Sequence, residues 1–541
     1  MSIASFAVLT FVRGVYDEYH RYTVRNDRLD KVHPFTQLQM PRTDEGGTLS
    51  LIYGRCLVRS PVCAWIGGLE QTETFDSEAD VDGVYFYRAK MFFVIGIPFS
   101  GGIQKVHAIY DGETRLHGKN ESPTYVGSPN TGTASLSDLL GTGNFEPTGP
   151  APVGGDPESA ANRARRGSFA GANTPAGRSY GYLEFLNGSS SQQLIDPITF
   201  LPLTVAGENM LLEIAPSFIP AYRGFLSAFL FARTSTPGPS PGFPNRGWVL
   251  DKATELPAIG FEVSSYPGQE ALVSSSIGDD CNPMDVLRDV LDGELGKLGM
   301  PASLIDVDSF REAAQILHAE SHSYSRSIEG ASAREVVGEI MEQVDGVLYD
   351  DPASGTLKVK LIRPDFDVLV IPHITPDNCE RLEGFTIRGL TGLPNKVRLN
   401  YTSRMANYQE RSATAHNQAN AVGQDGLVSE LSINMPGVCT AALAESLAAR
   451  ELAANSRPVM VCRAIVDRGF GAVFPGFAVF LSWPEYHVSN VVFRVANVDR
   501  GGPQDNTIAF DLIQDFSYVH RMVVYGTNEV APFPGAAEIL Q

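Results

Sequence analysis

The sequence has few of the residues that build disulfide or zinc scaffolds. Its 541 residues include only six cysteines, scattered from Cys56 to Cys462 without a CxxC pair. Cysteines that hold small secreted domains or zinc sites come in closely spaced sets, so neither kind of scaffold is expected and a reducing place of synthesis fits. One alternative stays open, because Cys56 and Cys63 could meet across a hairpin.

Long apolar runs are also missing. The first apolar stretch, Ile3 to Val12, is short, has no basic residues before it and is followed by Arg13 and further charges. A signal peptide needs a basic start, and a membrane-spanning helix needs about 20 apolar residues. The sequence therefore predicts a soluble protein without a membrane span, made in the cytoplasm.

Basic residues are in the minority, with 42 Lys and Arg against 62 Asp and Glu and a formal net charge of -20. A simple nucleic-acid binder carries the opposite sign, because its affinity comes from neutralising phosphates. An acidic surface can simply increase solubility, or it can let DNA pass without adhering. The charge balance thus argues against specific DNA binding.

Motifs of nucleophilic and phosphate chemistry are absent as well: there is no GxSxG elbow, GxxxxGK[ST] loop or GxGxxG turn after a strand. The segment from His318 to His322 comes nearest to a metal motif. Helical spacing places these two histidines on one face but turns Glu320 away, and no third ligand is in sight. A polar pair at a helix end is the favoured interpretation, and no metal or cofactor is expected.

Two acidic pairs, Asp279-Asp280 and Asp350-Asp351, could be posed as glycosidase carboxylates. Both lie in turn contexts, where aspartate is favoured for local hydrogen bonds. The sequence therefore predicts no catalytic residue and no enzyme.

What the sequence does have is the composition of a β-rich protein with many turns: 52 Gly, 35 Pro, 29 Phe and 19 Tyr. A chain of this length is too long for one core, and three to four domains are expected. Strand patterns occur at 49–58, 62–65, 84–97, 106–110, 210–214, 225–231, 259–263, 385–388, 396–401 and 459–516. Asp111-Gly112, directly after the strand at 106–110, is a hairpin signal.

Between these β regions lies a helical segment with clear start signals. Asn282-Pro283 combines a side-chain cap with proline at the first helical position. Ser309 to Glu312 and Ser332 to Glu335 each read as a capping box. A hairpin with its turn at 350–355 follows, which makes this segment a compact α+β domain. One Ala-rich helix is expected later, at 440–455.

The predicted fold class is therefore a β-rich multidomain (α+β) protein, with two antiparallel β-barrel domains joined by a small helical α+β domain. A long loop insertion rich in Gly, Ser and Pro interrupts the first β region; its Arg163, Arg165 and Arg166 could touch a phosphate or a partner's carboxylates, or simply lie in a solvated loop. The expected boundaries are an N-terminal arm at 1–45, a split first barrel at 46–117 plus 199–270, the insertion at 118–198, the helical domain at 271–377, a second barrel with one helix at 378–525, and a C-terminal tail at 526–541.

The sequence contains an ordered series of short motifs over about 480 residues: Tyr53-Gly54-Arg55, Ala64-Trp65, Val106 to Gly112, Pro220 to Gly224, Leu256-Pro257, Phe261-Glu262-Val263, Asn282-Pro283, Ile305-Asp306, Ser309-Phe310, Leu357 to Arg363, Asn395 to Tyr401, Tyr408-Gln409, Pro475-Gly476, Phe493-Arg494-Val495 and Gln514-Asp515. As an ordered set, they resemble the tail hub (baseplate hub or tail-tip hub) proteins of tailed bacteriophages and gene transfer agents. The insertion does not look like a family constant. The long C-terminal fibre modules of many relatives are not expected in this chain, so that receptor binding would be left to another protein.

The resemblance implies a non-enzymatic structural protein at the distal tip of a virion tail, synthesised in the host bacterial cytoplasm. Such hubs form a homotrimer whose two barrels per subunit make a pseudo-six-fold ring, which adapts the tail tube to the tip or fibre and forms the channel for DNA ejection. Implied partners are the chain itself, a distal tail protein or tail tube ring, the C-terminus of a tape measure protein, and central fibre or tip proteins. Double-stranded DNA would pass without specific binding.

Two other functions remain as alternatives. A tail-tip cell-wall hydrolase would release dye-labelled peptidoglycan. A receptor- or glycan-binding tail protein, which the aromatic-rich β content would suit, would adsorb tightly to cells as an isolated chain.

Overall fold

The computed structural model describes most of the chain between Thr48 and Phe516. The described residues are 48–76, 81–99, 102–112, 114–117, 166–169, 181–186, 188, 222–233, 245–246, 248–249, 258–268, 271–273, 276–294, 297–364, 366–367, 369–387, 389, 392–502 and 504–516. The predicted N-terminal arm, the strand at 210–214, Arg163, Arg165, the C-terminal tail and most of the insertion lie outside them.

The N-terminal part of the described chain forms two antiparallel sheets. A five-stranded sheet has the order β12-β1-β11-β4-β5, and a seven-stranded sheet has the order β10-β3-β8-β7-β6, with β2 beside β3 and β9 beside β8. The strands are β1 (Leu51–Val58), β2 (Val62–Asp76), β3 (Val81–Gly96), β4 (Ile103–Asp111), β5 (Thr114–His117), β6 (Arg166–Phe169), β7 (Gly181–Leu186), β8 (Leu226–Arg233), β9 (Asn245–Arg246), β10 (Trp248–Val249), β11 (Ile259–Tyr266) and β12 (Arg326–Ile328).

Six of these twelve strands, β1 to β4, β8 and β11, overlap strands predicted from the sequence. The Asp111-Gly112 hairpin is confirmed, since Asp111 pairs with Thr114 and Gly112 has φ +57°. By contrast, the sequence predicts no strand inside the insertion, yet β6 and β7 lie there and extend the seven-stranded sheet. Short strands surrounded by Gly, Ser and Pro carry too little apolar periodicity to be recognised.

A helical unit follows. It comprises α4 (Pro283–Asp292), the 3₁₀ turn η1 (Ala302–Leu304), α5 (Val307–Ala319), α6 (Ala333–Val344) and the hairpin of β13 (Gly346–Asp351) and β14 (Thr356–Leu361). The Asn282 cap and the Ser332–Glu335 capping box are confirmed. The predicted capping box at Ser309 is wrong: α5 begins earlier, at the cap Asp306, whose side chain accepts a hydrogen bond from the Ser309 amide. Aspartate caps a helix as well as serine does, so the pattern alone did not separate the two sites.

The C-terminal range, for which one β domain is predicted, contains two separate hydrophobic clusters. One belongs to a six-stranded sheet of order β15-β21-β22-β23-β20-β16. Its strands are β15 (His373–Ile374), β16 (Cys379–Ile387), β20 (Met460–Asp467), β21 (Ala478–Trp483), β22 (Val488–Asp499) and β23 (Thr507–Gln514). The end strands β15 and β16 are consecutive in the chain, so the sheet curls back on itself.

The second cluster lies between α8 (Ala441–Asn455) and a three-stranded sheet of order β18-β17-β19. This sheet is built from β17 (Lys396–Ser403), β18 (Gln409–His416) and β19 (Glu430–Asn434), with the short turn η2 (Arg404–Ala406) between β17 and β18 and helix α7 (Gln418–Gly423) before β19. The chain leaves the six-stranded sheet after β16, builds this unit, and returns at β20. The Ala-rich helix is confirmed.

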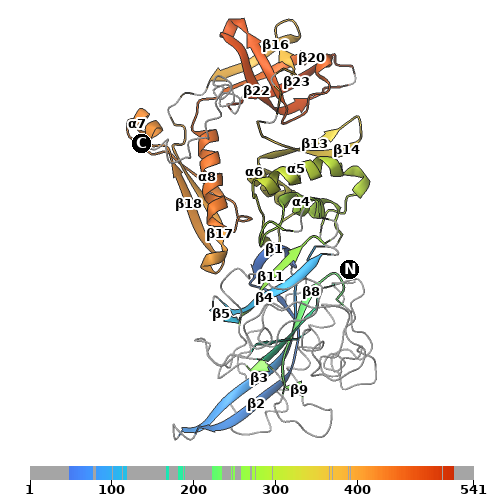
Figure 1. Cartoon of the computed structure of the whole chain (residues 1–541), viewed down its shortest axis with the longest axis vertical. Coiled ribbons are helices and arrows are strands. Elements are labelled where there is room, and N and C mark those ends of the chain that lie inside the picture. The colour runs from blue at the N-terminus through green and yellow to red at the C-terminus, as the bar shows by residue number, and fades with distance from the viewer. Residues whose placement is uncertain are drawn as a thin grey trace, which may run out of the picture.

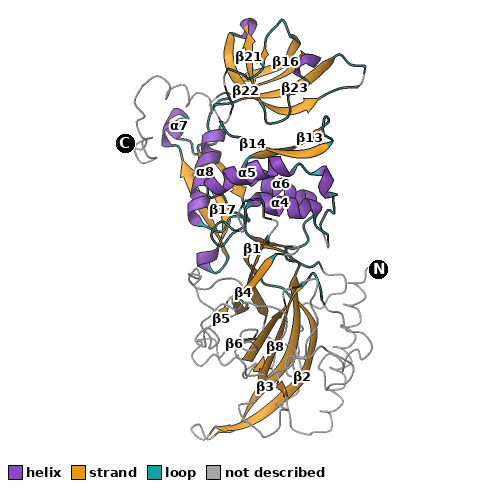
Figure 2. Cartoon of the chain, turned by 45° about the vertical axis from the view of Figure 1, so that its right-hand side comes forward, coloured by secondary structure: helices purple, strands orange, loops and turns teal. Residues whose placement is uncertain are grey.

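The units are arranged along one long axis (Figure 1). The N-terminal sheets lie at one end, the helical unit in the middle and the six-stranded sheet at the other end, while the unit of α8 and β17 to β19 lies alongside. Figure 2 shows the same layers after rotation. One hydrophobic cluster contains Tyr53 and Tyr266 of the five-stranded sheet together with the cores of α4, α5 and α6, so the first two units share a core. The fold is β-rich, and closure of two barrels stays a prediction.

Candidate functional site: two buried arginine joints

The first joint lies where the five-stranded sheet, the turn before α4 and the β17–β18 connection meet. Arg55 on β1 is at its centre: its Nε donates to Glu262 Oε1 at 2.7 Å and its Nη1 to Asp279 Oδ2 at 3.0 Å. The side chains of Arg55 and Glu262 are only 2% and 1% exposed. Strands β1 and β11 are buried along their whole lengths, so a charge on either must find its partner inside the protein.

The β17–β18 connection completes this joint from the far end of the chain. Arg404 forms an ion pair with Asp280 and donates to the Arg55 carbonyl at 3.4 Å, and the Tyr408 hydroxyl donates to Glu262 Oε1 at 2.9 Å. Burial alone would lower the pKa of the Arg404 guanidinium, but the charge and hydrogen bond of Asp280, together with Tyr408 and Cys439, outweigh burial and raise this pKa. Two non-glycine residues with positive φ, Asn407 (55°) and Tyr408 (59°), make the tight turn that inserts this tyrosine.

The turn before α4 is held on its other side by serines. Asp280 Oδ1 accepts a hydrogen bond from the Ser325 hydroxyl at 2.5 Å, and its Oδ2 accepts one from Ser323 at 3.2 Å. Gly54 packs directly against Ser325, since a Cβ built on Gly54 would lie 1.9 Å from Ser325 Oγ. Asp279 and Asp280, posed as carboxylates of a glycosidase, are therefore ion-pair partners of two arginines.

The second joint connects the helical unit to the six-stranded sheet through Arg494 on β22. Its Nε donates to Asp515 Oδ2 at 2.7 Å, its Nη1 donates to the Gly476 carbonyl at 2.9 Å, and its Nη2 donates to the Arg363 carbonyl. The guanidinium also lies over the Phe366 ring, 4.9 Å from its centroid. One buried side chain thus binds a sheet, the turn at Gly476 (φ +85°) and the linker from β14.

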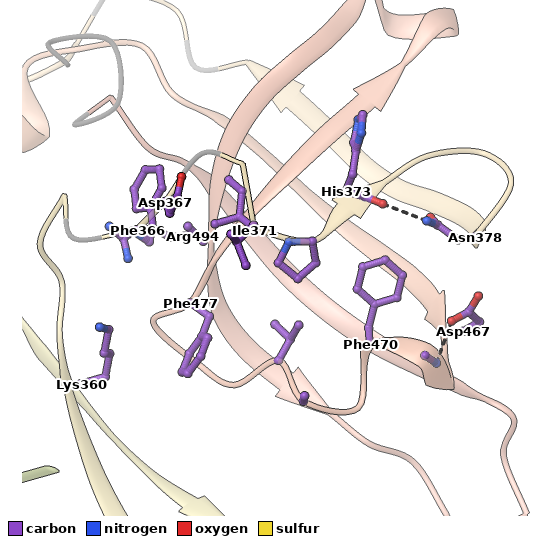
Figure 3. Close-up of a pocket in the computed structure, with 16 residues that line it drawn as sticks. Lys360, Phe366, Asp367, Ile371, His373, Asn378, Asp467, Phe470, Phe477 and Arg494 are labelled. Carbon is purple, nitrogen blue, oxygen red and sulfur yellow. Dashed lines mark hydrogen bonds between the residues drawn. The ribbon is translucent and has the colours of Figure 1, made fainter. Parts of the chain in front are cut away.

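A cavity of about 810 Å³ lies beside this second joint (Figure 3). Phe366, Phe470 and Phe477 surround it, and its two acids serve local turns, because Asp367 Oδ1 accepts from the Leu369 amide and Asp467 Oδ1 from the Gly469 amide. His373 at the rim is exposed and hydrogen-bonded to the Ser482 hydroxyl at 2.8 Å, and the half-buried Ser482 also contacts Asn490 Oδ1. The cavity suits an apolar group, and its polar side chains are occupied by structural hydrogen bonds.

The structure separates the two histidines that helical spacing predicted on one face, because α5 ends at Ala319 and His318 is exposed in its last turn. His322 lies beyond the helix and is buried, and burial, followed by Arg450, lowers its pKa to about 3. Glu320 accepts two hydrogen bonds from Arg363, at 2.7 and 2.8 Å. Across the described ranges no group of three or more His, Cys, Asp or Glu is arranged to hold a metal.

The remaining candidates have structural roles too. Asp351 pairs with Lys358 and caps the hairpin turn, which lowers the pKa of its carboxyl to about 2. All six cysteines are buried free thiols, so Cys56 and Cys63 are not bonded to each other. In the part of the chain with described positions, no helix is both long and apolar enough to cross a membrane.

The motifs that carry the sequence resemblance gather at these joints. Arg55, Glu262 and Tyr408 meet in the first, and Gly476, Arg494 and Asp515 in the second. The sequence missed Arg404 and the pairing itself. A charged residue inside an otherwise apolar strand, as in Leu51–Val58 and Ile259–Tyr266, is the signal that could have found them.

The comparisons with known proteins agree with the resemblance seen in the sequence. Residues 332–498 match the family model of a putative phage tail protein. The fold is similar to that of a chain in the virion of a native gene transfer agent particle, with 13% sequence identity, a TM-score of 0.52, and coverage of 91% of this chain and 90% of that one. No curated protein sequence matches the chain significantly.

Two tail proteins match over smaller parts. They are the tail protein from Neisseria meningitidis MC58 (14% identity, TM-score 0.26, 36% of this chain and 59% of that one) and the 43 kDa tail protein of prophage MuSo2 from Shewanella oneidensis (15%, 0.22, 35% and 55%). The predicted resemblance to phage and gene transfer agent tail proteins is confirmed by the family match and by the shared virion-protein fold.

Proposed function

We propose that this chain is the structural tail hub of a phage-like particle, a homotrimer at the distal end of the tail tube. Its ring would adapt the tube to the tip or fibre and surround the path of the ejected DNA. The observation that carries the proposal is the similarity of fold to a gene transfer agent virion chain, because it extends over 91% of this chain and 90% of that one.

The joints support a role in assembly. A hub must present its β units at a fixed angle to neighbouring subunits, and buried ion pairs between units are specific in direction as well as in partner. The domain boundaries predicted from sequence fit this proposal, with the unit of α8 and β17 to β19 as an additional body within the second β region.

The chemistry of the acids supports a structural rather than an enzymatic role. The acidic pairs at 279–280 and 350–351 include carboxylates bound by arginine, lysine or backbone amides. These contacts occupy the carboxylate oxygens that a catalytic acid would have to present to a substrate.

The test is to image intact particles that carry this chain with a small insertion tag, together with native mass spectrometry of the purified chain. A tag density with three-fold symmetry at the distal end of the tube is expected. Density along the tube or in the head would contradict the proposal. Release of dye-labelled peptidoglycan by the purified chain would favour the hydrolase instead, and tight adsorption of the isolated chain to cells would favour the receptor-binding function.

The implied partners can be tested in the same particles. Chemical cross-linking with mass spectrometry should connect this chain to tube or distal tail proteins, the tape measure protein and tip proteins. An absence of all such links in particles that contain the chain would count against the hub.

A further inference from the structure

The cavity beside the second joint has an apolar wall that the described residues leave partly uncovered. It measures about 810 Å³, and nine of its sixteen lining residues are Phe, Val, Ile, Pro or Ala. Val370 in the wall and its neighbour Leu369 are 77% and 92% exposed. Large apolar side chains that gather around an open cavity of this size mark a place where another segment or molecule binds.

The chemistry of the wall indicates what kind of segment fits. The rings of Phe366, Phe470 and Phe477 surround the cavity (Figure 3). Grooves lined by aromatic rings bind extended proline-rich segments, because proline fixes its own backbone angle and little conformational entropy is lost on binding. The charged residues of the wall are balanced, with two cations and two acids: Lys360, Arg494, Asp367 and Asp467. An apolar, proline-containing segment is therefore the occupant that this cavity suits.

The last described strand ends beside the cavity. Arg494 lines the cavity, and its guanidinium lies over the Phe366 ring at 4.9 Å from the centroid. The same guanidinium donates from Nε to Asp515 Oδ2 at 2.7 Å. The described part of this strand region ends one residue later, at Phe516. One side chain thus separates the wall of the cavity from the start of residues 517–541.

Those residues contain a segment of the required kind. Pro532-Phe533-Pro534 places one aromatic side chain between two prolines. Proline favours an extended backbone for itself and for the residue before it, so this sequence favours the conformation that aromatic grooves bind. Seventeen residues lead from Phe516 to Phe533. A linker of that length can span about 55 Å when extended, which is more than the return to the cavity needs.

The other long segments outside the described residues are attached elsewhere. Residues 1–47, 118–165 and 189–221 all connect to strands of the N-terminal sheets. Those sheets and the six-stranded sheet lie at opposite ends of the long axis (Figure 1). The segment that follows Phe516 is therefore the one whose attachment point lies beside the cavity.

We infer that Pro532-Phe533-Pro534 folds back into the cavity of its own chain, with the Phe533 ring among the three phenylalanines. The tether keeps the segment near the cavity at an effective concentration of roughly millimolar, so a modest apolar contact is enough to fill it. The occupant would touch the linker at 366–373 and the loop at 470–478 together, and so hold the second joint from the side opposite Arg494. The inference goes beyond the proposed function and does not depend on it.

Photo-cross-linking in the full chain tests this contact. With p-benzoylphenylalanine in place of Phe533, irradiation should give cross-links to residues 366–373 and 470–478 of the same chain, which mass spectrometry identifies. Ala472 is an exposed lining residue, so Ala472→Trp fills the cavity without disturbing a buried position and should remove these cross-links. Ala496→Trp is the matched control, because it adds the same side chain at an exposed position of β22 outside the cavity and should keep them.

Amide exchange tests the docking without a cross-linker. The amides of Val370 and Val473 belong to the wall, and each donates a hydrogen bond of 3.0 Å within its own turn. Burial of a phenylalanine side chain strengthens a contact roughly ten- to hundredfold. Phe533→Ser should therefore make both amides exchange several-fold faster than in the wild-type chain. Tyr525→Ser removes an aromatic ring from the same tail outside the Pro-Phe-Pro sequence, and it should leave their exchange unchanged.

The remaining outcomes would overturn the inference. They are the absence of cross-links, cross-links to other parts of the chain, cross-links between isotopically labelled and unlabelled copies, cross-links that A472W leaves in place, and equal exchange in F533S and Y525S. None of these measurements depends on how many copies a particle holds or where they lie in the tail. The proposed function and this inference can therefore fail separately.

Discussion

Replacing Arg55 by methionine should destabilise the first joint more than any surface substitution. The change removes the cation that binds Glu262 at 2.7 Å and Asp279 at 3.0 Å. Glu262 keeps its hydrogen bonds from the hydroxyls of Tyr408 and Tyr110 but stays buried without the arginine charge. Two unit charges about 4 Å apart attract by about 4 kcal/mol at an effective dielectric constant of 20. Breaking a buried pair costs about 3–5 kcal/mol, because one charge is left uncompensated.

The assay should report on the first unit alone, since a chain with several units does not unfold in one two-state step. The chain has three tryptophans: Trp65 on β2, Trp248 on β10 and Trp483 on β21. In a Trp483→Phe background, tryptophan fluorescence during urea titration follows only the N-terminal sheets. The free energy of unfolding of this transition should fall by about 3–5 kcal/mol in Arg55→Met.

A double variant supplies the control. Arg55→Met combined with Glu262→Leu removes both charges, and replacement of a buried pair by apolar residues is often close to neutral. The double variant should recover most of the loss. A loss below about 1 kcal/mol in the single variant would refute the reasoning, because that is the range of an exposed pair, and a double variant as unstable as the single one would show that packing rather than charge is responsible.

Three further predictions concern other positions. Gly54→Ala should lower the melting temperature of the first unit strongly, because Gly54 has φ +60° and its new Cβ would overlap the Ser325 hydroxyl; unchanged melting would contradict the close approach. Asp285→Asn should raise stability at pH 7 by about 1–3 kcal/mol, because burial raises the pKa of Asp285 to about 6. A carboxyl with a raised pKa contributes its stability below pH 4 and loses it as the pH rises through 6. Urea titrations between pH 4 and 7 should therefore show the free energies of unfolding of the wild type and the variant diverging as the pH increases. A constant difference between the two free energies over this range would exclude the effect. Arg494→Met should loosen the six-stranded sheet from the helical unit, because Asp515 would lose the arginine charge while its side chain stays only 9% exposed. The expected result is faster amide exchange in residues 474–477 and 492–496. Arg463→Met is the control, because the Arg463 side chain is 42% exposed; equal exchange in both variants would refute the role of the second joint.

Local elements could be predicted from the sequence wherever neighbours in the chain determine them. The caps at Asn282 and Ser332 and the turn at Gly112 need only residues within three or four positions, and all three are confirmed. The start of α5 was placed wrongly because Asp306 and Ser309 are both good caps and the choice depends on the bond between the Asp306 amide and Leu357, far along the chain.

The joints could not be predicted in this way. Arg55 and Glu262 are 207 residues apart in the sequence, and Arg404 and Asp280 are 124 residues apart. Each residue alone has an ordinary explanation, a charged strand residue or an aspartate in a turn. The resemblance to tail hubs singled out several of these residues without indicating that they contact each other. The separate core of α8 and β17 to β19 was missed for a related reason: the Ala-rich helix has weak amphipathicity in sequence, and its partner strands look like those of the neighbouring sheet.

The choice of arginine at both joints has a physical consequence for an assembled tail. An apolar contact between two units tolerates sliding, because hydrophobic burial has no preferred direction. A guanidinium with a planar fork of donors accepts its partners only within a narrow range of angles. Arg494 uses all three of its nitrogens on three different segments, and Arg55 and Arg404 together bind the sheet, the turn and the β17–β18 connection. The double variant Arg55→Met with Glu262→Leu should therefore unfold at nearly the wild-type urea concentration. Small-angle scattering should nevertheless show a broader distribution of orientations between the N-terminal sheets and the rest of the chain. These two results together would mean that Arg55 and Glu262 fix the angle between units rather than add stability.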